Sequence, residues 1–171
     1  IWVNKQRARG KDFTFIPYST SAGSLMVKKS SNTTNIMELK DLRVGIAGSS
    51  IDKSWLLLRA YGMKTYGIDF KNYFKPSYAA PPLINGLIKN NELDASFNYW
   101  NYTARLKANN YREILNFNEV LIALNIEENL PLIGYVFRES FANSNAELIK
   151  KFIESSKKAK QILLESNDEW L

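Results

Sequence analysis

Strand-like and helical patterns alternate from residue 43 to residue 137 of this 171-residue chain. Residues 43–47 form an apolar run typical of a strand, and residues 51–66 carry a helical pattern that ends at Gly67. The prolines at positions 81 and 82 suit a first helical turn and predict a helix through residue 89. Residues 93–97 place apolar side chains at alternate positions, as a further strand would. Ser144 and Glu147 predict a capping box ahead of the last helix. This alternation is typical of an α/β protein. We therefore predict a doubly wound mixed sheet with helices on both faces.

The amino-acid composition removes several classes of catalytic site. The chain contains no Cys and no His, which excludes a thiolate nucleophile, a disulfide and a Ser-His-Asp triad. The acidic pairs at residues 127–128 and 168–169 are interpreted as solvated charges rather than as a catalytic dyad. We expect no catalytic residue, no metal site and no cofactor, and we predict that the chain is not an enzyme.

The net charge of +6 permits an anionic partner, but the basic residues are scattered. The densest basic stretch, residues 5–11, lacks the interleaved aromatic side chains on which single-stranded nucleic acids stack. We expect no nucleic-acid partner. No run of about 18 apolar residues is present to span a membrane. The first residues lack a signal-peptide pattern, and we interpret the chain as a mature fragment whose beginning has been removed.

The segment from residue 43 to residue 55 is the first candidate site. A strand that ends in Gly-Ser-Ser before a helix directs backbone N–H groups and the positive end of the helix dipole to one point. Ser49 followed by Asp52 predicts the helix start. An anionic or strongly polar head would bind Ser49, Ser50 and Ser54, and Trp55 or Trp100 would cover an organic group; the alternative is only a well-capped helix. The pattern disfavours a nucleotide-binding P-loop, because Ile51-Asp52 stands where the final glycine of that motif would be.

Two further segments are candidate ligand contacts. Asn98, Trp100 and Asn101 follow a strand, and ligands of open α/β sheets bind beyond the carboxyl ends of strands. The small residues 19–24 would form a hinge or a ligand-lining loop, with Ser19, Ser21 and Gly23 as its contacts. An aromatic residue packed under a loop and an ordinary turn are the alternatives for these two segments.

The sequence resembles a known family in several places. Residues 39–48 are similar to the entry into the second lobe of periplasmic solute-binding proteins of the nitrate/sulfonate/taurine-type ABC transporter family. Residues 92–95, Glu-Leu-Asp-Ala, resemble a strand entry of that family, and residues 134–141 resemble its return strand and helix. Residues 19–27 are similar to its hinge strand, whereas the first lobe of the family is absent from this sequence.

The resemblance implies a function and a division of the chain. Residues 1–42 would be a hinge and partner-lobe segment, residues 43–124 the ligand-binding α/β lobe, and residues 125–171 the return strand and C-terminal helices. Such a protein captures a small anionic or polar ligand, similar to a sulfonate, nitrate or taurine, between two lobes and delivers it to a membrane permease. A periplasmic or extracellular monomer, with or without a lipid anchor, is the implied form.

The resemblance leaves other functions to weigh. The same architecture serves as the effector-sensing domain of bacterial transcription regulators, where a helix-turn-helix would precede it. A pyrimidine synthase of thiamine biosynthesis also resembles this family, but its chemistry depends on a histidine that this chain lacks.

Overall fold

The computed structural model describes residues 2–20, 22–126, 131 and 133–170. The chain divides into two compact units, which are described separately. The sheet unit comprises Ser19–Ile133, and the second unit combines Ile1–Tyr18 with Gly134–Leu171. Residues 19–42, assigned from the sequence to a hinge and partner-lobe segment, thus belong to the sheet unit, because they supply one of its interior strands.

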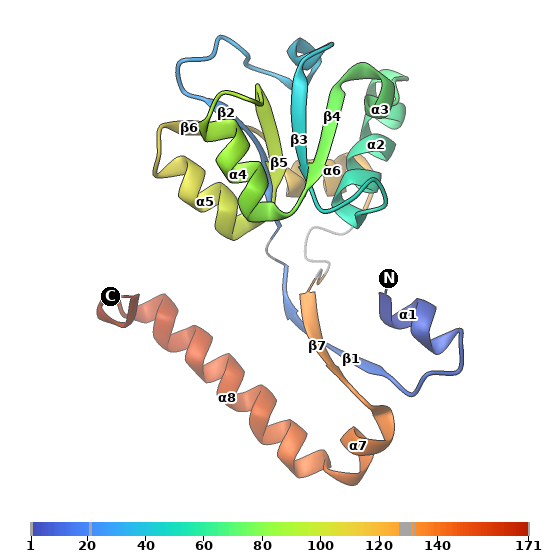
Figure 1. Ribbon diagram of the computed structural model, residues 1–171. Helices are drawn as coiled ribbons and strands as arrows, with labels where there is room; N and C mark the ends of the chain where they lie inside the picture. The colour runs from blue at the N-terminus through green and yellow to red at the C-terminus, as the bar shows by residue number, and fades with distance from the viewer. Residues whose placement is uncertain (1, 21, 127–130, 132, 171) are drawn as a thin grey trace. The chain divides into compact units, whose positions relative to one another are not determined.

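A five-stranded mixed sheet forms the centre of the sheet unit (Figure 1). Its order is β4-β3-β5-β2-β6, and β3 lies parallel to both β4 and β5, whereas β2 lies antiparallel to both β5 and β6. The strands are β2 (Ser24–Lys28), β3 (Arg43–Ala47), β4 (Lys75–Ala79), β5 (Ala95–Asn98) and β6 (Tyr111–Asn116). The short helix η1 (Ile36–Leu39) connects β2 to β3.

Helices cover both faces of this sheet (Figure 1). On one face Leu25 and Val27 pack in a core with side chains of α2, α3 and α6, while on the other Met26 packs against α4 and α5. This two-sided burial explains why all four residues of β5 are buried, and it confirms the predicted α/β fold class. The helices are α2 (Lys53–Tyr66), α3 (Phe70–Tyr73), α4 (Pro81–Lys89), α5 (Trp100–Lys107) and α6 (Phe117–Ala123).

The second unit pairs two strands beside a long helix. Its elements are α1 (Trp2–Arg7), β1 (Thr14–Ser19), β7 (Ile133–Phe137), α7 (Glu139–Ser144), α8 (Ala146–Glu165) and η2 (Asp168–Trp170). β1 pairs with β7, and Tyr135 and Phe137 of β7 place their rings 4.7 and 5.8 Å from that of Phe152 on α8. None of the helices among the described residues is both long and apolar enough to cross a membrane.

The start of α8 differs from the sequence-based prediction. Ser144 was expected to cap the last helix together with Glu147, but Ser144 is the last residue of α7. Asn145 stands at the N-cap of α8 instead, and no side chain makes a cap hydrogen bond there. The predicted capping box is therefore wrong, because the preceding residues already form the helix α7.

Candidate functional site

Four strands of the sheet end at the same edge. β3, β4, β5 and β6 run in one direction, and Ser24 at the start of antiparallel β2 pairs with both Asn98 and Asn116 at this edge. After each of the four strands a helix begins there. We call this edge the carboxyl rim and define it as residues 22–24, 48–54, 80–82, 98–102 and 116–119.

The carboxyl rim contains the switch point of the sheet. From β3 the chain passes through α2 and α3 to β4 on one side, and then through α4 to β5 on the other side. The loops after β3 and β5 therefore lead to helices on opposite faces of the sheet, and this is the position at which doubly wound proteins bind their ligands. The sequence predicted that the loops after Ala47 and Phe97 would point to one edge if their strands were neighbours. β3 and β5 are paired in parallel, so both loops leave the sheet at the same edge.

The helix after β3 is capped by the protein's own carboxylate. Asp52, not Ser49, is the N-cap of α2, and its Oδ1 accepts a 2.9 Å hydrogen bond from the backbone N–H of Ser54. Ser49 and Ser50 are exposed in the preceding turn, in which Ser49 Oγ accepts from Ile51 N–H at 3.4 Å. The predicted helix start at residue 51 is therefore wrong, and an anion would meet a negative charge at this helix terminus.

Asp52 also connects the loops after β3 and β5. Tyr99 donates its phenolic hydrogen to Oδ2 of Asp52 over 3.0 Å. Burial, together with the charge of Asp52 and this hydrogen bond, raises the pKa of Tyr99 to about 12. Gly48 lies against the same pair at φ +94°, and a Cβ atom there would come within 3.2 Å of Oδ2 of Asp52.

Asn98 is buried and holds the rim together instead of facing a ligand. Its Nδ2 donates to the carbonyl of Pro81 and to Oδ1 of Asn85, both at 2.9 Å, and its Oδ1 accepts from Tyr99 N–H at 2.8 Å. Asn85 in turn donates to the carbonyl of Tyr102 over 3.0 Å. These bonds occupy both ends of the Asn98 amide, so Asn98 is corrected from a ligand contact to a structural residue.

Gly23, just before β2, lies against the backbone of Asn98 and Tyr99 at the rim. A Cβ atom at this position would lie 1.5 Å from the carbonyl oxygen of Asn98, so only glycine permits this approach. The carbonyl of Gly23 accepts from Phe117 N–H at 3.3 Å, which brings α6 to the same place. Of the other two predicted contacts in this segment, Ser19 is the last residue of β1, and Ser21 lies outside the described residues.

The two tryptophans of the predicted site have opposite environments. Trp55 is fully buried, with its ring 6.1 Å from that of Tyr78 in an edge-on arrangement, and so it cannot cover a ligand. Trp100, at the start of α5, exposes 49% of its surface, and Asn101 beside it is partly exposed. Trp55 is thus corrected to a core residue, whereas Trp100 lies on the rim with a free aromatic surface.

The remaining helices of the rim start differently from one another. α4 has Pro81 and Pro82 in its first turn, and neither residue carries a backbone N–H donor. α6 starts with a capping box in which Asn116 accepts from Asn118 N–H at 2.8 Å and Glu119 accepts from Asn116 N–H at 3.1 Å. No side chain makes a cap hydrogen bond at the start of α5.

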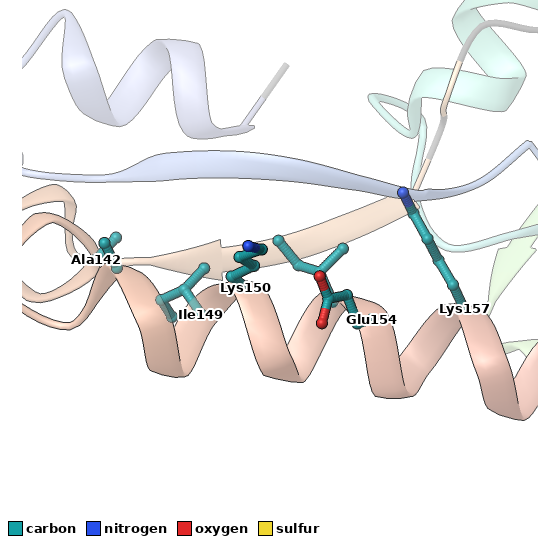
Figure 2. Close-up of a pocket in the computed structure, with 7 residues that line it drawn as sticks. Ala142, Ile149, Lys150, Glu154 and Lys157 are labelled. Carbon is teal, nitrogen blue, oxygen red and sulfur yellow. The ribbon is translucent and has the colours of Figure 1, made fainter.

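A separate hollow lies on the second unit. Side chains of α7 and α8 line a space of about 380 Å³. Figure 2 shows these side chains as sticks. Apolar side chains, among them Ile149, form part of its wall, and Lys150, Glu154 and Lys157 add charges to it. Within the described residues, no three Asp or Glu side chains gather where they could hold a metal ion.

Comparisons with known proteins cover almost the whole chain. Residues 3–170 match the family model described as NMT1/THI5 like, whereas no curated protein sequence matches. The periplasmic aliphatic sulphonate binding protein SsuA from Escherichia coli superposes with a TM-score of 0.71 at 20% identity, over 96% of this chain and 54% of that one.

Two other solved structures share the fold. The alkanesulfonate-binding protein SsuA from Xanthomonas axonopodis pv. citri, bound to MOPS, gives a TM-score of 0.67 at 15% identity, over 92% of this chain and 52% of that one. The ligand binding component of an ABC-type import system from Staphylococcus aureus gives a TM-score of 0.62 at 14% identity, over 90% of this chain and 51% of that one. The chain thus spans about half the length of the structures it matches.

Proposed function

The chain belongs to the NMT1/THI5-like family, and from this premise we propose that it is the solute-binding component of an ABC importer. The resemblance inferred from the sequence is confirmed at the level of family and fold. In the proposed function the protein captures a small polar organic solute and hands it to a membrane permease, and it makes or breaks no covalent bond. Its place would be the periplasm or the outer surface of the cell.

The observation that carries the proposal is the convergence at the carboxyl rim. The Gly48 loop, Tyr99 and Gly23 come from three different strands and meet at the switch point of the sheet. Trp100 adds an exposed aromatic surface, and Ser49 and Ser50 add exposed hydroxyl groups. Concave sites with aromatic walls and a few polar groups are typical of small-molecule binding.

The mechanism follows from the size of the chain relative to its structural neighbours. Because the chain spans 54% of the length of the E. coli protein, the rim would form one side of a cleft, and further protein would form the other. A ligand that contacts both sides stabilises the closed arrangement over the open one, and a permease can recognise that closed state. The ligand is then delivered by reopening.

A thermal-shift and calorimetric screen of the complete protein tests this function. The panel contains alkanesulfonates, taurine, nitrate, aromatic acids and pyrimidines. A ligand present at 100 times its dissociation constant stabilises the folded state by about 2.7 kcal/mol. The variant Ser50→Ala should weaken binding, while Ser30→Ala, an exposed serine outside the carboxyl rim, should not. The absence of any stabilising member in the panel would contradict the proposed function.

A further inference from the structure

A second hollow of the sheet unit lies at the edge of the sheet opposite the carboxyl rim. β2 ends there at Lys28 and β6 begins there at Tyr111, which is the register partner of Lys28. Lys28 lies four residues along β2 from Ser24, about 13 Å at the usual rise of a strand. The space has a volume of about 470 Å³. We call it the amino-edge hollow, and its walls are formed by Lys28, Lys29, Ser30, Asn109, Asn110 and Tyr111.

Hydrogen bonds hold the walls of the amino-edge hollow in place. The N–H of Lys29 donates to the carbonyl of Asn110 at 2.9 Å, which joins the loop after β2 to the loop before β6. The guanidinium of Arg112 donates to the carbonyl groups of Ser31, at 3.0 Å, and of Thr33. The loop that carries the lysines is therefore tied to β6 on both sides of the hollow, so little ordering is needed when a ligand binds.

The charged groups in the walls have one sign. Two of the six wall residues are lysines, and none is an acid. Among the residues that the structure describes, neither ammonium group forms an ion pair: that of Lys28 donates to Oδ1 of Asn91, a neutral acceptor, and that of Lys29 has no partner. Charges of one sign that line a concave surface focus the field there and attract ligands of the opposite sign.

The ends of the neighbouring helices do not account for these lysines. Lysine side chains often bond to the last carbonyl groups of a helix. At the end of α5, however, the carbonyl of Arg105 accepts from Nδ2 of Asn109 at 2.7 Å, and that of Leu106 accepts from Asn109 N–H at 2.8 Å. At the end of α4 the carbonyl of Ile88 accepts from the Tyr111 hydroxyl at 3.1 Å. Because these carbonyl groups already have donors, the ammonium groups remain available to a ligand.

We propose that the amino-edge hollow binds a phosphate group, with the ammonium groups of Lys28 and Lys29 as its main contacts. A phosphate ester carries close to two negative charges at neutral pH and has three strong acceptor oxygens. These match two ammonium groups and the side-chain amide of Asn110, which has no partner among the described residues. A nitrate or a single carboxylate would balance only one of the two charges. The site is separate from the carboxyl rim, and the inference therefore does not depend on the proposed function.

Calorimetric titration of the complete protein at constant ionic strength tests the inference. Inorganic phosphate is the first probe, and glycerol 3-phosphate, which carries the same group on a small organic molecule, is the second. The wild type should bind at least one of them in a 1:1 ratio. In the double variant Lys28→Gln/Lys29→Gln the affinity should fall about tenfold or more, as expected for the loss of charge-assisted contacts.

The controls separate a specific site from net charge and from folding. Lys64→Gln/Lys158→Gln removes the same two charges from exposed positions that do not line the hollow, and it should bind phosphate as the wild type does. Lys29→Arg keeps the charge and should retain most of the affinity, whereas Lys29→Gln alone should weaken binding. Near-ultraviolet circular dichroism spectra equal to that of the wild type confirm the fold of each variant.

Each outcome supports or overturns the inference. Tighter binding of inorganic phosphate identifies a site for the free ion, and tighter binding of glycerol 3-phosphate identifies a site for an organic phosphate. The absence of binding by either probe overturns the inference, as does unchanged affinity in Lys28→Gln/Lys29→Gln. Equal losses in the two double variants also overturn it, because net charge alone then explains the binding. In all of these cases the titrations with the solute panel stand on their own, so the proposed function is judged separately.

Discussion

The hydroxyl of Tyr99 donates a 3.0 Å hydrogen bond to the carboxylate of Asp52, and this bond joins two loops that leave the sheet over opposite faces. Tyr99 is the N-cap residue of α5 and Asp52 is the N-cap residue of α2. One side-chain contact therefore connects the starts of two helices on the two sides of the switch point. Removal of this hydrogen bond should change both the free energy of unfolding and its dependence on alkaline pH.

Tyr99→Phe should lower the free energy of unfolding by about 1 kcal/mol, because a neutral donor to a partly buried carboxylate is lost. The raised pKa of Tyr99 adds a pH dependence: its stabilisation is present below the unfolded value of 10.0 and is lost as the pH rises through about 12. Urea unfolding at pH 7 and tyrosinate absorbance across the alkaline range measure the two effects.

Two controls accompany this substitution. Tyr102→Phe leaves the bond to Asp52 in place and should leave stability closer to that of the wild type. In Asp52→Asn, the tyrosinate signal assigned to Tyr99 by difference should move to lower pH, because the negative charge that opposes ionisation is gone. A signal that stays in place would show that burial alone raises the pKa of Tyr99.

Gly23→Ala should destabilise the protein by about 1–3 kcal/mol or more, because the added methyl group would overlap the carbonyl of Asn98. Gly86→Ala is the matched control: no atom lies within 4 Å of its added Cβ, and in the interior of α4 alanine should stabilise by about 0.5–1 kcal/mol. Chemical denaturation of both variants measures the difference. An unchanged free energy of unfolding in Gly23→Ala would contradict the close approach of β2 to β5.

Local signals in the sequence predicted several elements well. The helix that ends at Gly67 was recognised from a glycine suited to a left-handed cap, and Gly67 adopts φ +69° there. The helix from Pro81 to Lys89 was recognised because proline suits a first turn. In both cases a single residue type determines the backbone over a few positions, so no tertiary information was needed.

Features that depend on tertiary packing were missed or misplaced. β4 and β6 are the two edge strands of the sheet, and their sequences carry Lys75, Pro76, Arg112 and Glu113, which weaken the strand pattern. The burial of Trp55 depends on the position of Tyr78 on β4, a strand not predicted from the sequence. Long-range packing of this kind has no signature within the helix itself.

The choice of Asp52 over Ser49 as helix cap illustrates the same limit at the site. Both residue types are good caps, and they lie three positions apart. The loop after Ala47 decides between them, because Gly48 at positive φ and the turn from Ser49 to Asp52 delay the helix until Lys53. Because Asp52 is the cap, a carboxylate stands at the helix start where the sequence predicted an anion-binding site.

Acid conditions should weaken the protein through Asp69. Hydrogen bonds from Arg59 at 2.8 and 2.6 Å are the main cause that lowers the pKa of Asp69 to about 2. Because this pKa lies below the unfolded value of 3.8, the stabilisation is complete above about pH 4 and is lost as the pH falls through about 2. Asp69→Asn should therefore lose less stability than the wild type over this range, in urea unfolding at stepped pH.

A double-mutant cycle checks that the Arg59 guanidinium causes this acid dependence. Arg59→Ala should cost about 1 kcal/mol at pH 7, since the pair is partly exposed, and it should show the same flattened acid response as Asp69→Asn. The double variant should add little further change. Additive losses in the double variant would indicate that Asp69 acts through its cap on α3 alone.

Replacement of the two tryptophans near the rim should separate stability from binding. Trp55→Ala removes a fully buried ring from the core between α2 and the sheet, and large-to-small changes of this kind cost about 3–5 kcal/mol. Trp100→Ala removes a ring with 49% of its surface exposed, so the free energy of unfolding should change by about 0.5 kcal/mol or less. If Trp100 forms the wall of the solute site, the same substitution should weaken binding about tenfold or more in calorimetry. A stable Trp100→Ala protein with wild-type affinity would exclude this wall, and a stable Trp55→Ala protein would contradict the core position of that ring.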